Sequence, residues 1–203
     1  NGAPVDLNRL SLIPEKQDEA YNEYDFRLQI QNKVLSPQKA RVAYRLRNIL
    51  SIDDILYIDA VVNEVAIEFL IIRPNKGILI INLFEKDLGH CKLSNDNKEI
   101  ETEDCKYQNP IDRTKLCQTS IKDGIEELLI GTIENNRNFS LIKKIVIFSE
   151  NSIEQIKEFF KPNISFPNYT YIFGKEFIND RTVSLHLYNA IGFLSNNVFF
   201  DDV

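Results

Sequence analysis

Three side chains at one end of a hydrophobic hairpin have the spacing of a catalytic site. The stretch from Ile67 to Leu88, IEFLIIRPNKGILIINLFEKDL, contains two apolar segments around a Pro-Asn-Lys-Gly turn. If the loop is symmetric about Asn75, positions at equal distances from it lie opposite one another, which pairs Glu68 with Asn82. Phe84 shares the face of Asn82 because side chains alternate along a strand. We therefore expect one carboxylate, one amide and one aromatic ring close together.

The chemistry that this spacing could support is phosphodiester cleavage. A metal-dependent phosphodiesterase needs clustered carboxylates that hold Mg²⁺ and a lysine or other group near the attacking water. One acidic residue on the first strand and Glu-x-Lys on the second would meet that need, because the outer two residues share a face. Here the residues are Glu68 and the triplet Asn82-Leu83-Phe84. Asn82 offers only a neutral oxygen and Phe84 offers neither donor nor acceptor, so most of the chemistry is missing.

The hairpin that carries these residues is apolar on both faces near its turn. The odd-numbered positions predict one buried face, made of Ile67, Phe69, Ile71, Leu79, Ile81 and Leu83. The even-numbered positions near the turn are also apolar: Leu70, Ile72, Ile78 and Ile80. A hairpin buried on both sides lies inside a sheet. On the even-numbered face, the change from apolar residues to Glu68, Asn82 and Phe84 then marks one end of this buried part of the sheet.

Two longer segments have helical spacing. Ser36-Pro37 places Ser at the cap and Pro at the first position, and it predicts an amphipathic helix over about 37–50. A second helix is predicted over about 111–131, weakened by Gly124. The apolar stripe expected on this second helix consists of Leu116, Cys117, Ile121, Ile125, Leu128 and Leu129.

Shorter elements complete the order. They are a strand at 55–63, a short hairpin or exposed loop at 89–108, a strand at 143–149, a helix from a Ser152/Gln155 capping box through Phe160, a strand at 169–174 and a helix at 183–194. The strand–helix–strand unit is a crossover connection. The whole order predicts the α/β class, as a three-layer α/β/α sandwich with a mixed central sheet.

Composition favours one soluble domain. The chain has 203 residues, of which 43% are hydrophobic and 27% charged, and no run approaches the roughly 18–20 apolar residues of a membrane span. We expect a cytoplasmic protein with no membrane partner. The chain has no Met and begins Asn1-Gly2-Ala3-Pro4, so we interpret it as an excised domain that could carry a tag remnant in front. Residues 1–30 show no clean period and predict an N-terminal arm, with the domain at 31–203.

Charge and ligand residues exclude several function classes. The net charge of −6 gives no long-range attraction to nucleic acid, so any such contact must be local. Cys91, Cys105 and Cys117 match no zinc or disulfide framework, and no Ser-His-Asp set or glycine-rich phosphate loop is visible. No cofactor is expected, except Mg²⁺ or Mn²⁺ if the hairpin is active.

From about Pro37 to its end, the chain resembles the nuclease-related (NERD) domain family of the PD-(D/E)xK superfamily. The segments that carry the resemblance are PQKARVAYRLRNIL, IEFLIIRPNKGILIINLF, NPIDRTKLCQTSIKDGIEELL and the closing FLSNNVFFDDV. The resemblance implies a restriction-endonuclease-like fold. It also implies a covalently linked, helicase-like ATPase in the full-length chain, because the closing segment resembles the junction that precedes such a domain.

The departures from the family pattern concern the catalytic residues. The first helix, which usually carries a carboxylate, has Lys39, Ala40 and Arg41 at the matching place. The hairpin positions that carry Asp, Glu and Lys in the family are Glu68, Asn82 and Phe84 here, and Arg113 replaces the Gln that follows Asn109-Pro110. The resemblance therefore implies nuclease ancestry with a lost active site.

The leading hypothesis is a catalytically degenerate NERD-like domain that contacts DNA or regulates a larger DNA-processing ATPase. Its basic contacts would be Lys39, Arg41, Arg45 and Arg113, with Asn82 and Phe84 kept for packing.

Two alternatives stay open. One is an active Mg²⁺- or Mn²⁺-dependent nuclease in which ligands have migrated: Glu68 would be joined by Glu64, Glu85 or Asp87, with Lys86 in place of the missing lysine. The other is a protein–protein interaction domain with no role on nucleic acid. Glu68 could also be purely structural, paired with Arg73 or with an arginine of the first helix.

Overall fold

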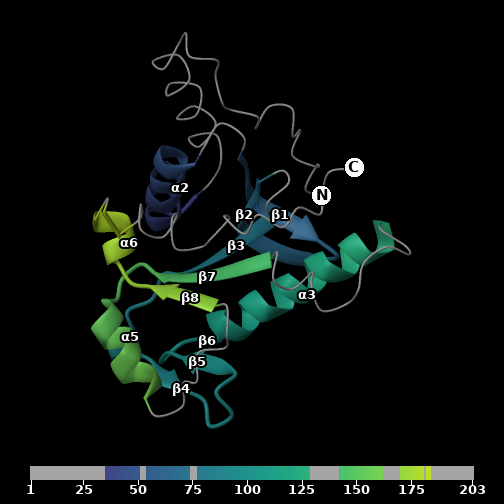
Figure 1. The fold of residues 1–203 in the computed structure, drawn as a ribbon. Helices are drawn as coiled ribbons and strands as arrows, with labels where there is room; N and C mark the ends of the chain where they lie inside the picture. The colour runs from purple at the N-terminus through teal and green to yellow at the C-terminus, as the bar shows by residue number, and fades with distance from the viewer. Residues whose placement is uncertain are drawn as a thin grey trace.

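A five-stranded mixed sheet forms the centre of the fold (Figure 1). The computed structural model describes residues 35–50, 54–73, 77–128, 142–161, 170–180 and 182–183. In sheet order the strands are β1 (Ile55–Val62), β2 (Val65–Arg73), β3 (Gly77–Phe84), β7 (Ile142–Phe148) and β8 (Thr170–Phe173). The first three strands are antiparallel, and β3, β7 and β8 are parallel. The predicted α/β class with a mixed sheet is confirmed.

Helices cover both faces of this sheet (Figure 1). On one face, α2 (Pro37–Ile49) and the short α6 (Glu176–Asn179) pack in one apolar cluster with the sheet. On the other face lie α3 (Pro110–Leu128) and α5 (Ile153–Phe160). In the described ranges, no helix combines the length and the apolar character that crossing a membrane requires.

The predicted helix starts are confirmed. The Ser36 hydroxyl accepts a hydrogen bond from the backbone N–H of Lys39 at 3.1 Å, which caps α2. The capping box of α5 is present, with Ser152 and Gln155 bonded reciprocally. The short α6 was not predicted. The arm expected at 1–30 and the helix expected at 183–194, apart from Val183, lie outside the described residues.

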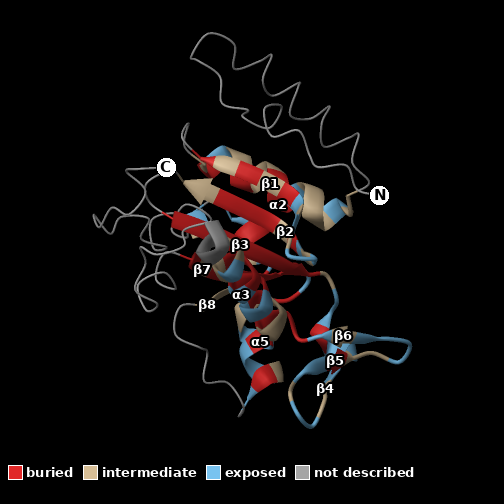
Figure 2. Cartoon of the chain, turned by 90° about the vertical axis from the view of Figure 1, so that its right-hand side faces the viewer, coloured by how far each residue is buried: buried red, intermediate tan, exposed pale blue. Residues whose placement is uncertain are grey.

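The predicted hairpin register is also confirmed. The β2–β3 ladder runs from Phe69 opposite Ile81 to Arg73 opposite Gly77, as symmetry about Asn75 requires. All of β3 is buried, which Figure 2 shows as a red strand within the sheet. The odd-numbered side chains of β3 pack towards α2 and the even-numbered ones towards α3.

The expected face of Ile67 is wrong, because β1 and β2 turn over at one point. Phe69 packs in the cluster below α2, whereas Ile67, two residues away, packs in the cluster below α3. Between them Glu68 is absent from the ladder, and the opposite residue, Asp59, has a left-handed backbone with a φ of 58°. The pairing resumes at Ala60 after this turn, so side chains beyond it face the opposite side of the sheet.

The predicted stripe on α3 is also partly wrong. Cys117 and Ile121 are buried, but Leu116 is 48% exposed. The buried side chains recur at Thr114, Cys117, Gln118 and Ile121, a spacing in which Leu116 falls outside the buried stripe. The side chains from residue 125 onward in this helix lie outside the description.

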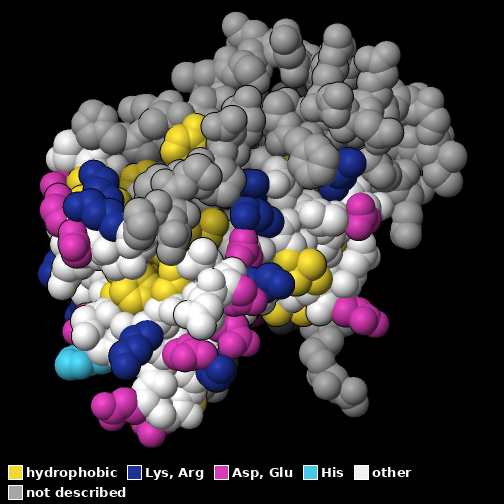
Figure 3. Space-filling model, turned by 90° about the horizontal axis from the view of Figure 1, so that it is seen from below, with side chains coloured by type: hydrophobic (Ala, Val, Ile, Leu, Met, Phe, Trp, Pro, Cys, Tyr) yellow, Lys and Arg dark blue, Asp and Glu magenta, His cyan; other side chains and the backbone are white. Residues whose placement is uncertain are grey.

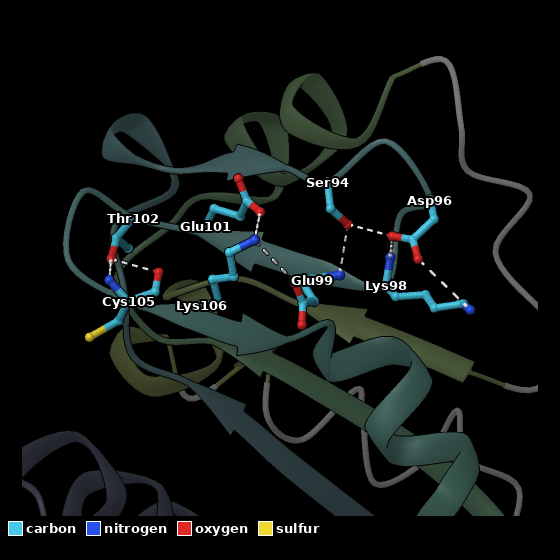
Figure 4. Close-up of polar contacts among 8 residues, drawn as sticks. All are labelled: Ser94, Asp96, Lys98, Glu99, Glu101, Thr102, Cys105 and Lys106. Atoms are coloured by element: carbon cyan, nitrogen blue, oxygen red, sulfur yellow. Dashed lines mark hydrogen bonds and ion pairs between the residues drawn. The ribbon is translucent and has the colours of Figure 1, made fainter.

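A second, three-stranded sheet replaces the hairpin or loop that was expected at 89–108. It follows the turn η2 (Leu88–His90) and consists of β4 (Lys92–Leu93), β5 (Glu99–Glu101) and β6 (Lys106–Gln108). Figure 4 shows its polar surface, where Lys106 reaches Glu101 at 2.6 Å and the Ser94 hydroxyl donates to Asp96 at 2.8 Å. Buried Ile100 attaches this sheet to the α5 side of the core.

Candidate functional site

Glu68 lies where β2 separates from β3, at the polar end of the hairpin. Its Oε2 accepts a hydrogen bond from the backbone N–H of Leu83. The pairing of β2 with β3 ends at Phe69 and Ile81, so the Glu68 carboxylate takes the place of a β2 backbone acceptor for this N–H. Burial raises the pKa of the Glu68 carboxyl. The Leu83 hydrogen bond and the cations of Lys39 and Arg113 offset part of that rise, and Glu85 adds to it. The expected pairing with Arg73 is wrong, because Arg73 binds the buried carboxylate of Asp54.

Asn82 occupies the second hairpin position and faces α3. It is 1% exposed, and its Nδ2 donates to the hydroxyl of Thr114 at 2.8 Å. That hydroxyl donates in turn to the carbonyl oxygen of Pro110 at 2.6 Å. The Asn82 Oδ1 is buried and has no hydrogen-bond partner among the described residues. The amide therefore connects the sheet to the first turn of α3, and one neutral oxygen is left over.

Phe84 occupies the third position as part of an aromatic core. The residue is 6% exposed. Its ring centroid lies 6.1 Å from that of Tyr107, edge to face, and 5.4 Å from that of Phe148. Both are favourable geometries for aromatic pairs. Phe84 thus joins the three-stranded sheet β4–β6 to β7. A catalytic lysine at this position would need access to solvent, which these rings block.

Glu64 and Glu85 are the first two carboxylates considered as replacement metal ligands beside Glu68. Glu64 is exposed and lies in the turn before β2, with a φ of 66°. It could share a face with Glu68 only if the strand extended to residue 64, and the strand begins at Val65. Glu85 is close enough to raise the Glu68 pKa, but its Oε1 accepts a hydrogen bond from the Ser36 hydroxyl at the start of α2. Glu64 therefore does not join Glu68, and Glu85 lies near Glu68 without a further acidic, His or Cys side chain among the described residues that would complete a metal site.

The other two residues considered for a rebuilt metal site, Lys86 and Asp87, make contacts away from Glu68. The Lys86 ammonium lies 5.4 Å from the ring centroid of Tyr107, over the small sheet. The Asp87 carboxylate accepts from the backbone N–H of Gly89 at 2.9 Å and caps η2. Within the described ranges, no group of three or more His, Cys, Asp or Glu side chains could hold a metal ion. A carboxylate cage for Mg²⁺ or Mn²⁺ is therefore not formed by these residues.

Two of the predicted basic contacts flank Glu68 from opposite faces of the sheet. Lys39 on α2 forms an ion pair with Asp59. Arg113 on α3 donates from Nη2 to the carbonyl oxygen of Ala66 at 3.4 Å. Both cations lower the Glu68 pKa, so they lie near the same edge. The structure thus brings these two together around one carboxylate.

The other two predicted basic contacts lie further along α2. Arg41 is exposed. Arg45 donates from Nη2 to the carbonyl oxygen of Ile178 in α6. Three of the four predicted basic contacts, Lys39, Arg41 and Arg45, thus lie on α2, and Arg113 lies on α3 on the other face of the sheet.

Comparison of the chain with protein-family models, with curated proteins and with solved structures finds no match. The resemblance to NERD domains therefore stays a prediction that rests on the four sequence segments.

Sequence reasoning missed a buried lysine on β7. Lys144 is 6% exposed and forms no ion pair with the described residues. Burial lowers its pKa, and the neighbouring Lys115 lowers it further. Its strand partner Thr170 has a buried hydroxyl without a hydrogen-bond partner among those residues. The only signal was a second lysine in the apolar run IKKIVIF, which alternation places on a buried face.

Proposed function

We propose that the chain is a catalytically degenerate, NERD-like nuclease-fold domain. It contacts DNA, or regulates DNA handling, as part of a larger helicase-like ATPase in the cytoplasm. The helices on both faces of the mixed sheet support a three-layer α/β/α sandwich, and the diverging hairpin supports the restriction-endonuclease-like version of it.

The observation that carries this proposal is the state of the three hairpin positions. Glu68 is bonded to the backbone of Leu83, Asn82 to Thr114, and Phe84 is enclosed by aromatic rings. Each side chain serves the packing of the sheet. One carboxylate is too few to hold a divalent cation firmly, and the described residues form no group of three or more acidic, His or Cys side chains that could complete a site.

Local positive charge supports the DNA contact. Arg113, Lys39 and Arg41 lie on the two helices that flank the polar edge, while the chain as a whole has a net charge of −6. Phosphate contacts by a few Lys and Arg residues give binding that weakens steeply as salt rises. The Asp59 carboxylate that holds Lys39 is half exposed, so a phosphate can compete with it.

The first test is DNA binding by fluorescence anisotropy over a series of salt concentrations. Arg113→Glu should weaken binding to duplex DNA and reduce the salt slope by about 1. Lys157→Glu, the same charge change on the exposed face of α5, is the matched control and should leave both unchanged. If the chain does not bind DNA even at low salt, the DNA contact is wrong and the protein-interaction alternative is favoured.

The second test is cleavage of supercoiled and single-stranded DNA in Mg²⁺ and in Mn²⁺. We expect no cleavage by the purified chain, because the described residues form no carboxylate cage. Cleavage that disappears in Glu68→Ala would reject the degenerate centre and establish the migrated-ligand nuclease instead.

A further inference from the structure

A polar hollow lies between α2 and the end of α6, away from the hairpin. Its volume is about 500 Å³, within the range of pockets that bind small molecules. The two helices lie next to each other in Figure 1, joined by the hydrogen bond from Arg45 to Ile178. The α2–α6 hollow is lined by Arg41, Tyr44, Arg45, Asn48, Ile178 and Asn179.

The lining has one charge sign. Residues 41, 44, 45 and 48 recur at i, i+3, i+4 and i+7, so they form one stripe of α2. Among the described residues, no acidic side chain lines the hollow, and α2 contains no Asp or Glu. Two arginines four residues apart repel each other unless an anion lies between them. On the face seen from below in Figure 3, acidic and basic side chains are intermixed.

The two arginines are available in different ways. Arg41 is exposed and forms no hydrogen bond or ion pair with the described residues. Arg45 uses Nη2 to bind Ile178, which fixes its guanidinium at the wall of the hollow. A guanidinium has five N–H donors, and among the described residues Arg45 uses one of its two Nη atoms, for Ile178. One arginine is thus positioned in advance and the other is free to close on an anion.

We infer that the α2–α6 hollow binds a nucleoside phosphate, with the phosphoryl group between Arg41 and Arg45. Paired N–H groups of arginine match the oxygens of a phosphate, which removes the need for a glycine-rich loop. The Tyr44 ring lines the hollow and is partly buried against the apolar cluster below α2. The exposed Asn48 and Asn179 amides offer donors and acceptors to a base or a ribose. A hollow of this size exceeds what inorganic phosphate alone would fill.

The phosphate has two sources, a free nucleotide or the terminal nucleotide of a nucleic-acid strand. The second source deepens the proposed function and rests on it, because Arg41 and Arg45 are among the proposed DNA contacts. The first source is independent of DNA binding.

The test measures binding of adenosine 5′-monophosphate, adenosine, and a short single-stranded DNA with and without a 5′-phosphate to the 203-residue chain. Calorimetry suits the small ligands and anisotropy suits the labelled DNA. Phosphorylated ligands should bind about tenfold or more tightly than their unphosphorylated counterparts. Arg41→Gln and Asn179→Asp should each remove most of that preference. Asn95→Asp, in the exposed β4–β5 turn, is the matched control for the added charge.

The outcomes separate the two proposals. Monophosphate binding without binding of the single strand supports the hollow with a free nucleotide as the source, and leaves the DNA contact to the duplex titration described above. A preference for 5′-phosphorylated DNA, lost in Asn179→Asp, supports both and identifies the strand end as the source. DNA binding that is insensitive to the 5′-phosphate and to Asn179→Asp, with no monophosphate binding, overturns the hollow and leaves the DNA contact standing. No binding of any phosphorylated ligand overturns the hollow, and the duplex titration described above then decides the DNA contact by itself.

Discussion

Substituting Phe84 by lysine restores the residue type that the nuclease pattern has at this position, and the structure predicts that the protein will not tolerate it. The Phe84 ring is 6% exposed and contacts the rings of Tyr107 and Phe148. Removing a buried Phe side chain costs about 3–5 kcal/mol. A lysine there loses the same contacts and must also carry its charge out of the aromatic core. We expect Phe84→Lys to lower the free energy of unfolding by about 4 kcal/mol or more.

The measurement is urea denaturation followed by circular dichroism, with Phe84→Leu as the matched control. Leucine keeps most of the apolar volume, so its loss should be about 1–2 kcal/mol. Both variants are also incubated with supercoiled DNA and Mg²⁺. The reasoning is refuted if Phe84→Lys is as stable as Phe84→Leu, and more strongly if it also gains metal-dependent cleavage. That result would mean that position 84 faces an open site.

Three further substitutions test other parts of the structure. Because the pKa of Glu68 is raised in the folded state, its carboxyl stabilises the protein below its ordinary pKa and this contribution is lost as pH rises through the raised value. Glu68→Gln keeps an acceptor for Leu83, so it should flatten the acidic side of the stability–pH curve and change stability near pH 7 by less than about 1 kcal/mol in urea titrations. Lys144→Met removes a buried ammonium that forms no ion pair with the described residues and should raise stability by about 1 kcal/mol or more, whereas a loss would show that the ammonium has a ligand. Gly174→Ala places a Cβ 2.5 Å from a carbonyl oxygen before α5 and should cost about 1–3 kcal/mol, visible as a lower midpoint of thermal unfolding.

Most of the secondary structure could be predicted because its signals are local. The start of α2 depends on Ser36-Pro37 and the start of α5 on the Ser152/Gln155 box, and both are short-range hydrogen-bonding patterns. The hairpin register follows from the turn and from an apolar run buried on both faces. The three-stranded sheet at 92–108 was not predictable in this way, since its strands have two or three residues each and too few positions to show a period.

The geometry of the candidate site was less predictable, because it depends on one backbone conformation. Alternation alone puts Glu68 and Asn82 on the same face. The left-handed Asp59 turns β1 and β2 over instead, which sends Ile67 to the α3 side and frees the Glu68 carboxylate for the Leu83 N–H. An Asp inside the apolar run ILYIDAVV was the available signal, because Asp tolerates the left-handed region better than β-branched residues do. The α2–α6 hollow needs two elements that are far apart in the chain, so no local pattern predicts it.

The hairpin keeps one carboxylate, one amide and one ring because each solves a local problem at the point where the strands part. Leu83 needs an acceptor after β2 leaves the ladder, and Glu68 supplies it. Asn82 connects the sheet to Thr114 in the first turns of α3, and Phe84 joins the small sheet to the core. A metal centre would need Glu68 ionised and joined by further carboxylates, whereas burial favours its protonated form. The fold thus uses all three side chains, and the described residues form no metal-binding group around them. The proposed nucleic-acid contact is therefore better sought in the basic residues of α2 and α3 than in the hairpin.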